Sequence, residues 1–347
     1  MNKRILFLFT FLVTLALVIA GGVGIATKSE KNAAELQHFA QENTSKEQTQ
    51  QGKREDTVQP TAAAEPQSAK PVAKQTWYEN QVVVLMYHHV TDQSDQPYVI
   101  TPEGFAAHMQ FLKENDLHPI SLTQFVQFVQ TGVSPVDNAV LITFDDGYES
   151  YYTEAFPILK QYQFPSVNFL ITGRLKDSSE RKRPNVTPPL TYQEIQEMRA
   201  SGLAEFGSHT YSLHGQEAKN EWGELGPETA PVYLEDLGRL EDTQEYRDRL
   251  YVDFLMSRIG LGDLLGERIQ TISLPFGFTN EVVIETAKQA GYEYVFNSHP
   301  AVVKPGVDPF SIPRFDVGLR EIDAGKLREL FAKARDSLRE GDHGRGT

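Results

Sequence analysis

Two adjacent carboxylates, Asp145 and Asp146, follow the apolar, β-branched run NAVLITF, and Gly147 comes directly after them. Successive side chains of a strand point to opposite faces, so neighbouring carboxylates at a strand end can do different work. One could hold a metal ion while the other faces a substrate, and Gly147 would let the backbone turn sharply beside a ligand. The alternative interpretation is an ordinary Asp-Gly turn.

Titratable side chains also follow two other apolar runs. His209 and His214 come after AEFGS, and their spacing of five does not place them on one helix face. On a loop that leaves a strand, two imidazoles can converge on one ion, and the alternative is a pair of surface loop histidines. His88 and His89 end the run VVVLMY, and we expect one of these two to be a half-buried core histidine.

The elements that would position these residues alternate between strand-like and helix-like segments. Continuous apolar strands alternating with helices are typical of a parallel sheet covered by helices. We therefore predict an α/β fold, a distorted (β/α) barrel of about seven parallel strands, with the site at the carboxyl ends of the strands. The predicted strands are 81–87, 139–144, 166–172, 203–208, 270–276, 292–297 and 310–317, and the predicted helices are 101–116, 148–163, 191–202, 243–260 and 279–292.

Composition narrows the class of protein. The chain has 347 residues, of which 40% are hydrophobic, so a sizeable core can form. Its net charge of -14 repels phosphate backbones, and we expect no nucleic-acid partner. It contains no cysteine, which excludes disulfides, thiolate nucleophiles and cysteine-ligated zinc.

The N-terminal part of the chain predicts export. Residues 1–28 begin with the basic stretch MNKR and continue with an uncharged run of 23 residues from Ile5 to Thr27. Because roughly 20 apolar residues cross a bilayer, we favour a retained membrane anchor over a cleaved signal peptide. The basic start would stay inside, so the remainder would be extracytoplasmic, anchored at the cell surface or secreted.

Two further regions follow this segment. Residues 29–76 are polar and rich in Gln, Glu, Lys and Thr, which predicts a flexible linker. Basic and acidic residues nearly balance up to Thr76, so the negative charge of the chain belongs to the rest. We expect residues 77–347 to form the catalytic domain.

The motif TFDDG at Thr143 to Gly147, together with SHTYSLH at 208–214, resembles the polysaccharide deacetylases of the NodB-homology type, carbohydrate esterase family four. Either motif alone is a weaker signal than the pair, and the resemblance runs from about residue 81 to about residue 317. LMYHHV precedes TFDDG in this chain. That order is similar to the order in the deacetylases of the biofilm polymer poly-β-1,6-N-acetylglucosamine, the IcaB/PgaB type.

The resemblance implies metal-assisted hydrolysis of an N-acetyl group on a sugar. Asp146, His209 and His214 would hold a divalent metal, with zinc as first choice and nickel, cobalt or iron as alternatives that fit. The same ligand set suits non-haem iron oxygenases, but Asp145 and the likeness to sugar enzymes argue against that class. Asp145 would be the general base, and His88 would be the general acid.

The third motif of the family departs from its usual form. R-x-P-Y in much of the family stands here as SLPFG at 273–277, so the arginine is absent and Phe276 replaces the tyrosine. Pro275 and Phe276 would contact the substrate, with the Phe276 backbone N–H at the oxyanion. Arg314, in the run IPRFDV, is the candidate to orient Asp145 in place of the missing arginine.

These implications predict hydrolytic N-deacetylation of an extracellular N-acetylglucosamine polymer, poly-β-1,6-N-acetylglucosamine of a biofilm matrix. One alternative is a peptidoglycan N-acetylglucosamine deacetylase. The other is a non-catalytic carbohydrate-binding wall protein, for which the missing arginine is the only support. The expected partners are the N-acetylated polysaccharide and the membrane that holds the N-terminal segment, and we expect a monomer.

Overall fold

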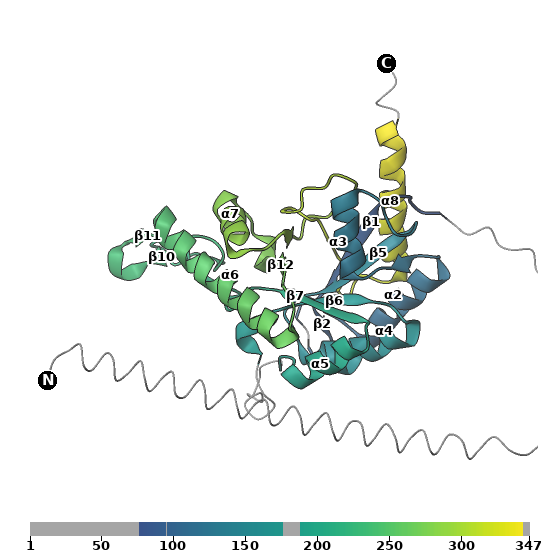
Figure 1. Cartoon of the computed structure of the whole chain (residues 1–347), viewed down its shortest axis with the longest axis horizontal. Coiled ribbons are helices and arrows are strands. Elements are labelled where there is room, and N and C mark those ends of the chain that lie inside the picture. The colour runs from purple at the N-terminus through teal and green to yellow at the C-terminus, as the bar shows by residue number, and fades with distance from the viewer. Residues whose placement is uncertain (1–75, 95, 176–187, 343–347) are drawn as a thin grey trace, which may run out of the picture. The chain divides into compact units, whose positions relative to one another are not determined.

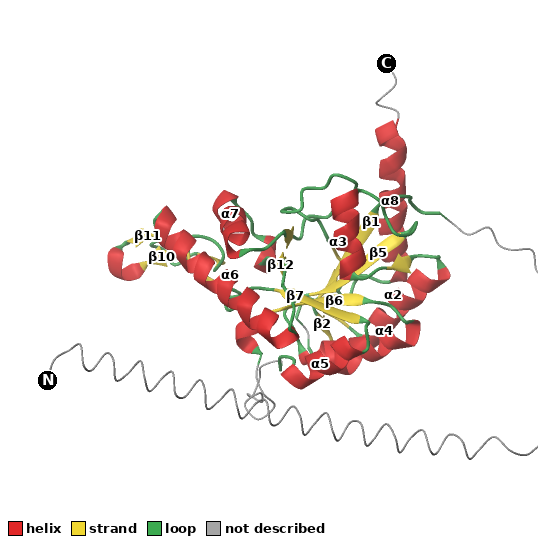
Figure 2. Ribbon diagram, viewed as in Figure 1, coloured by secondary structure: helices red, strands yellow, loops and turns green. Residues whose placement is uncertain are grey.

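The apolar runs of the sequence form one parallel sheet, which sits at the centre of the molecule with helices around it (Figures 1 and 2). Its strand order is β13-β12-β7-β6-β5-β1-β14, and β4 pairs with β5. All seven predicted strands are present and the curled parallel sheet confirms the predicted distorted barrel. The strands are β1 (Val82–Tyr87), β4 (His118–Pro119), β5 (Ala139–Phe144), β6 (Ser166–Leu170), β7 (Ala204–Ser208), β12 (Thr271–Ser273), β13 (Tyr294–Phe296) and β14 (Phe315–Asp316).

A computed structural model of the chain describes residues 76–94, 96–175 and 188–342. The predicted anchor at 1–28 and nearly all of the predicted linker at 29–76 lie outside these residues, so both stay predictions. Within the described residues, no helix combines the length and the apolar character that a membrane crossing requires.

Helices cover the sheet, and all five predicted helices are present with local capping of the expected kind. The Thr101 side chain accepts from the Gly104 N–H at the start of α2, and Thr191 forms a reciprocal capping box with Glu194 at the start of α5. The helices are α2 (Pro102–Glu114), α3 (Leu122–Thr131), α4 (Phe156–Tyr162, preceded by a π-helical turn at Tyr151–Ala155), α5 (Tyr192–Ala200), α6 (Thr243–Leu265), α7 (Glu281–Ala290) and α8 (Ala324–Asp342).

Two helices were not predicted, several strands are shorter than predicted, and the helix predicted at 148–163 is a π-helical turn from Tyr151 followed by α4 from Phe156. α3 and α8 were not among the predicted helices. α6 does not end at Gly260 but continues to Leu265, where Gly266 adopts a φ of 66° and ends it. The extra turn matters for packing because Leu261 and Leu265 are both buried.

Alternate residues of the central strands enter two separate apolar clusters, so both faces of the sheet are covered. Val83 and Leu85 of β1 belong to the larger cluster. Val82 and Val84 belong to the smaller one, which also takes Phe125 from α3. Burial on both faces explains why these strands read as continuous apolar runs in the sequence.

One short segment connects the two edges of the sheet. Ile312 bridges to Phe296 of β13 in parallel fashion, and Phe315 and Asp316 pair with β1 on the opposite edge. Arg314 lies between these two pairings, and its side chain is 1% exposed. The segment therefore completes the distorted barrel and places a guanidinium inside it.

Three pairs of short strands lie in the loops between the main elements. They are β2 (His89–Val90) with β3 (Val99–Ile100), β8 (Gln216–Ala218) with β9 (Leu225–Pro227), and β10 (Tyr233–Leu234) with β11 (Arg239–Leu240).

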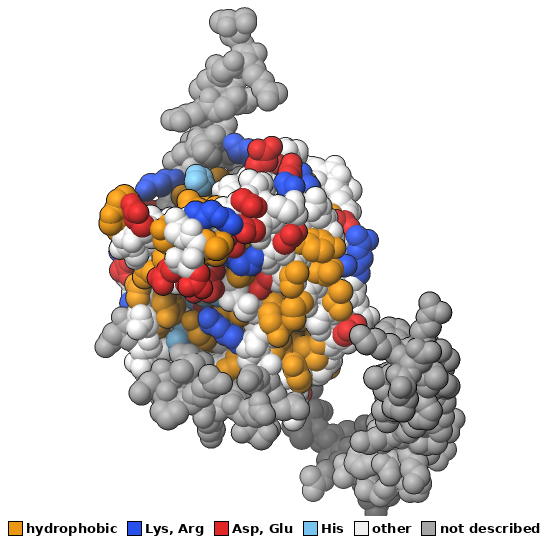
Figure 3. Space-filling view, turned by 90° about the vertical axis from the view of Figure 1, so that its left-hand side faces the viewer, with side chains coloured by type: hydrophobic (Ala, Val, Ile, Leu, Met, Phe, Trp, Pro, Cys, Tyr) orange, Lys and Arg blue, Asp and Glu red, His pale blue; other side chains and the backbone are white. Residues whose placement is uncertain are grey.

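α6 presents an exposed apolar face, because Val252, Met256 and Ile259 are spaced by four and three along it. Figure 3 views the left-hand side of the molecule in Figure 1, where hydrophobic side chains form patches among charged ones.

Candidate active site

The two adjacent aspartates follow β5 and have different environments. β5 ends at Phe144, so neither aspartate is part of the regular strand. Asp146 has a φ of 76° and Gly147 a φ of 72°, so the chain enters a left-handed turn at the second aspartate. The separation of the two carboxylates was predicted, but its cause is this turn rather than strand alternation.

Asp145 forms a bidentate ion pair with Arg314. The guanidinium donates to Oδ1 over 2.8 Å and to Oδ2 over 2.7 Å, and both side chains are almost fully buried. Ser273 Oγ accepts from Arg314 over 2.7 Å and donates to Asp145 Oδ2 over 3.1 Å. The residue proposed from sequence as the substitute for the missing arginine therefore contacts the carboxylate it was expected to orient.

The charge of Arg314 sets the ionisation of Asp145. Burial by itself raises the pKa of Asp145, but the guanidinium of Arg314 and the imidazole of His209 outweigh burial and lower it to about 2. Arg314 is further held by the Asn297 carbonyl, to which its Nε donates over 2.9 Å. Asp145 is thus an ionised carboxylate over the whole neutral pH range.

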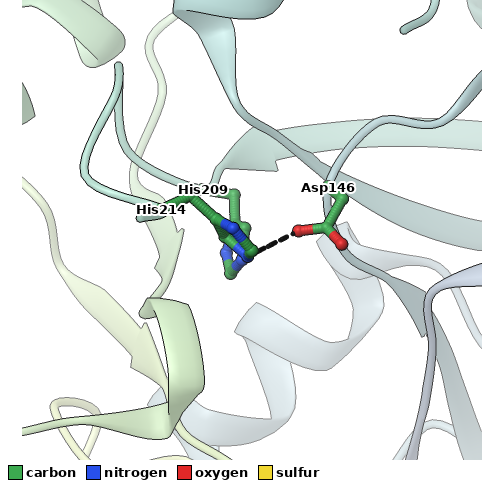
Figure 4. Close-up of side chains that lie close together, drawn as sticks. All are labelled: Asp146, His209 and His214. Atoms are coloured by element: carbon green, nitrogen blue, oxygen red, sulfur yellow. Dashed lines mark ion pairs between the residues drawn. The ribbon is translucent and has the colours of Figure 1, made fainter. Parts of the chain in front are cut away.

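Asp146, His209 and His214 converge on one point, as Figure 4 shows. One ligand atom from each lies within 4.8 Å of the others. Asp146 Oδ1 is 2.9 Å from Nε2 of His214 and 3.4 Å from Nε2 of His209. Asp146 and His209 are buried, while His214 is partly open to solvent, so the cluster has one accessible side.

The donor set fits a divalent cation. His209 Nδ1 lies 2.8 Å from the Ser273 carbonyl oxygen, and only a protonated Nδ1 can bond there, so in the neutral ring the Nε2 lone pair faces Asp146. Asp146 Oδ1 is buried and has no hydrogen-bond donor of suitable geometry among the described residues. A lone pair opposed to a carboxylate oxygen is the arrangement that a metal ion between them would stabilise.

His88 and His89 have different environments, and one of them is the core histidine expected from the sequence. His89 Nδ1 is 2.6 Å from Ser150 Oγ, and burial lowers its pKa to about 4 despite the opposing charge of Asp146. His89 is therefore the neutral core histidine. His88 is partly exposed, and its Nδ1 is buried without a hydrogen-bond partner among the described residues.

Asp316 faces His88 and was missed by sequence reasoning. Burial raises the pKa of Asp316, and the charge of His88 acts in the opposite direction. Asp316 ends β14, two residues after Arg314, which precedes that strand. Its place close to Arg314 in PRFDV was the available sequence signal.

Two tyrosines border the cluster and were also missed. Tyr148 directly follows DDG and stacks on His89 with ring centroids 4.8 Å apart, and burial together with the charge of Asp146 raises its pKa. Tyr98 also stacks on Tyr148, with centroids 6.4 Å apart. The tyrosine that ends TFDDGY was the sequence signal for this wall of the site.

The turn after β12 places Phe276 beside His214. Phe276 has a φ of 56°, unusual for a bulky residue, and its ring is 53% exposed, with its centroid 5.2 Å from that of His214. The N–H groups that close this turn belong to Gly277 and Phe278, so the turn does not use the Phe276 N–H. Pro275 is buried in the same turn.

Residues 132–295 match the family model described as polysaccharide deacetylase. A poly-beta-1,6-N-acetyl-D-glucosamine N-deacetylase of Escherichia coli is 31% identical over 247 residues, which cover 68% of this chain and 37% of that protein. One of Staphylococcus aureus is 27% identical over 258 residues, which cover 70% of this chain and 81% of that protein. The matched region thus spans little more than a third of the Escherichia coli relative.

The fold of a solved relative agrees with these matches. A de-N-acetylase from Aggregatibacter actinomycetemcomitans superposes with a TM-score of 0.64 at 28% identity. The superposition covers 72% of this chain and 99% of that one. Matching sequence, matching fold and the convergence of the family's two motifs on one cluster lead to one conclusion: the chain belongs to the polysaccharide deacetylase family.

Proposed function

We propose that the chain is a metal-dependent N-deacetylase of an extracellular N-acetylglucosamine polymer, poly-β-1,6-N-acetylglucosamine. The convergence of Asp146, His209 and His214 beside the Asp145–Arg314 pair carries this proposal. The names of the Escherichia coli and Staphylococcus aureus relatives support the β-1,6 polymer as the substrate. The position of LMYHHV ahead of TFDDG supports the same branch of the family.

The metal would be held by Asp146, His209 and His214, with zinc as first choice. A divalent cation there would supply Lewis acidity toward the acetyl carbonyl and toward a water molecule. The hydrogen bond from His209 Nδ1 to the Ser273 carbonyl fixes that ring so that Nε2 faces the ligand point. His214 approaches from the partly open side, where the substrate would enter.

Asp145 would take the proton of the attacking water. Its Oδ2 accepts hydrogen bonds from Arg314 and Ser273, whereas Oδ1 accepts one from Arg314, so Oδ1 has a lone pair for that proton. Arg314 holds the carboxylate in a fixed plane through two parallel bonds. A positioned base of this kind contributes on the order of 10²–10⁴ to the rate.

Proton donation to the leaving amine would come from His88, with Asp316 facing its ring. The Phe276 N–H, which its own turn does not use, would stabilise the oxyanion, and Pro275 would fix that turn.

The proposal includes the location of the protein. The uncharged run from Ile5 to Thr27 supports export with a retained anchor, and the domain would act outside the membrane as a monomer on the polysaccharide. High-salt washing should leave the full-length chain with membranes. Recovery of the protein from culture medium with a start near Gly21 would show a cleaved signal instead.

Acetate release by the full-length, metal-loaded protein tests the activity. We expect release from acetylated β-1,6-glucosamine oligomers, much slower release from peptidoglycan, and loss of both after chelation. Faster release from peptidoglycan would identify the cell wall as the substrate. Binding to either polymer without acetate release would identify a carbohydrate-binding protein and contradict the proposal.

A further inference from the structure

In the loop that carries His209 and His214, every backbone N–H and C=O group of residues 210–212 has a hydrogen-bond partner. The Thr210 N–H donates to Ser208 Oγ, and the Ser212 carbonyl accepts from the His214 N–H. Thr210 itself has a φ of 71°, a conformation that a β-branched residue adopts only when its surroundings impose it. Contacts from α6 and from the segment after β6 surround this part of the loop.

Asp253 of α6 holds the loop from one side. Its Oδ1 accepts the Tyr211 N–H over 2.8 Å, and its Oδ2 accepts the Ser212 N–H over 2.8 Å and the Ser212 hydroxyl over 3.1 Å. The Asp253 side chain is buried, and burial raises its pKa against the effect of these donors. One carboxylate thus fixes two successive peptide groups midway between the two histidines.

The segment after β6 holds the loop from the other side. The Thr172 N–H donates to the Thr210 carbonyl over 3.1 Å, and the Gly173 N–H donates to the Tyr211 carbonyl over 2.8 Å. A Cβ at Gly173 would lie 2.4 Å from the Tyr211 carbonyl oxygen, so only glycine allows this approach. Ser257, one turn after Asp253 on α6, joins the two sides through the Ser208 and Thr172 hydroxyls.

We propose that Asp253 is a positioning residue for the metal: its carboxylate sets the separation and direction of His209 and His214 by fixing the backbone between them. This inference rests on the metal site of the proposed function. It assigns a role to α6, a helix that supplies no ligand and lies beside β7 in Figure 1.

A carboxylate is required because all three groups that face Asp253 are donors. Two N–H groups and a hydroxyl need two acceptor oxygens, and the side-chain amide of asparagine offers one oxygen and one donor. Asp253→Asn would therefore set an N–H group against a backbone N–H while changing neither size nor shape. The loop would relax, and the two imidazoles would lose their common direction.

Metal affinity, measured without any substrate, tests the role. Full-length protein purified in mild detergent is stripped of metal and titrated with Zn²⁺ and Co²⁺ by calorimetry and visible absorption. We expect Asp253→Asn to raise the Kd about 10–100-fold, the usual effect of losing a group that orients metal ligands. Asp263→Asn, the same change at an exposed position of α6, should leave the Kd unchanged.

Gly173→Ala probes the loop without touching Asp253, and it also covers the case in which Asp253→Asn fails to fold. It should raise the Kd in the same direction, because the new Cβ displaces the Tyr211 carbonyl. A Kd equal to that of the parent in a folded Asp253→Asn variant, or in Gly173→Ala when the first variant does not fold, overturns the positioning role. A parent chain that binds neither cation overturns the metal site and the proposed function with it.

Discussion

Asp145 and Asp146 are neighbours in the chain and equally inaccessible, with exposures of 2% and 4%, yet their environments are opposite. Asp145 has a full counter-charge from Arg314 and hydrogen bonds on both oxygens. Asp146 faces two imidazoles and has an oxygen without a donor of suitable geometry. Arg314 neutralises the first carboxylate, whereas the cation of the proposed function would neutralise the second.

The difference shows how one dipeptide can serve two chemical roles. A buried carboxylate paired with a buried guanidinium is fixed in charge and direction, which suits a group that must accept a proton repeatedly. A buried carboxylate opposed to imidazole lone pairs is a ligand set. Ser273 contacts both environments: its carbonyl accepts a hydrogen bond from His209, and its hydroxyl donates to Asp145 and accepts from Arg314.

The largest effect should come from Asp146→Asn. A neutral amide oxygen is a poorer ligand for a dication than a carboxylate, so we expect metal content after dialysis and acetate release to fall together. The loss of affinity should exceed the 10–100-fold typical of residues that only orient ligands. A variant that retains as much metal as Asp263→Asn after dialysis would show that Asp146 is not a ligand.

Asp145→Asn should separate turnover from metal binding. We expect turnover to fall by about 10²–10⁴ with metal content near that of the parent, because the ligand cluster is intact. The structure adds a second effect: Arg314 would stay buried without its counter-charge, which typically costs about 3–5 kcal/mol of folding free energy. Metal content and urea unfolding check the two effects, and loss of metal here would reverse the assignment of the two aspartates.

A double-mutant cycle should measure the Asp145–Arg314 pair directly. Arg314→Met alone leaves a buried carboxylate unpaired, and Asp145→Asn alone leaves a buried guanidinium unpaired. The double variant removes both charges, so its loss of unfolding free energy should be smaller than the sum by about 1–3 kcal/mol. Strict additivity in urea unfolding of chelator-treated protein would mean that the pair contributes nothing as a pair.

Acid should lower the free energy of unfolding in two pH windows, one set by His89 and the other by Asp145. The pKa of His89 is about 4 in the folded protein against 6.5 ordinarily, so the unfolded chain binds more protons between these values and stability falls as the pH drops from 6.5 to 4. The pKa of Asp145 is about 2 against 3.8, so its contribution is present above pH 3.8 and is lost toward pH 2.

Urea unfolding of chelator-treated protein at a series of pH values would resolve these windows. Asp145 should account for about 2–3 kcal/mol, because a tenfold difference in proton affinity between the folded and unfolded chain corresponds to about 1.4 kcal/mol. His89→Gln should flatten only the upper window and Asp145→Asn only the lower one. A parent curve without slope between pH 6.5 and 4 would contradict the neutral, buried state of His89.

Much of the fold was predictable because its strands are buried on both faces and therefore read as apolar runs. α3 was harder, since LTQFVQFVQ mixes β-branched and aromatic residues that are common in strands. The identity of the clustered site residues followed from two motifs. The turn at Asp146 did not, because a positive φ at a non-glycine residue is imposed by tertiary contacts.

Other parts of the site depend on contacts between distant segments. Arg314 bonds Asp145 across a sequence separation of 169 residues, and the sequence suggested it only as a substitute for the missing arginine of the third motif. Asp316 and Asp253 had no motif to mark them. Asp253 acts through backbone N–H groups, and no pattern of residue types in one sequence reports which side chain will accept them.

The strand segment at Ile312 to Asp316 has a consequence for how the protein comes into being. A ribosome releases the chain from its N-terminus, so the aspartates emerge long before the residues that join the sheet edges and neutralise Asp145. Contacts of such long sequence separation form late and slowly in folding. The carboxylate of Asp145 can therefore be oriented only after the segment from Ile312 to Asp316 has been made and has joined the two edges of the sheet.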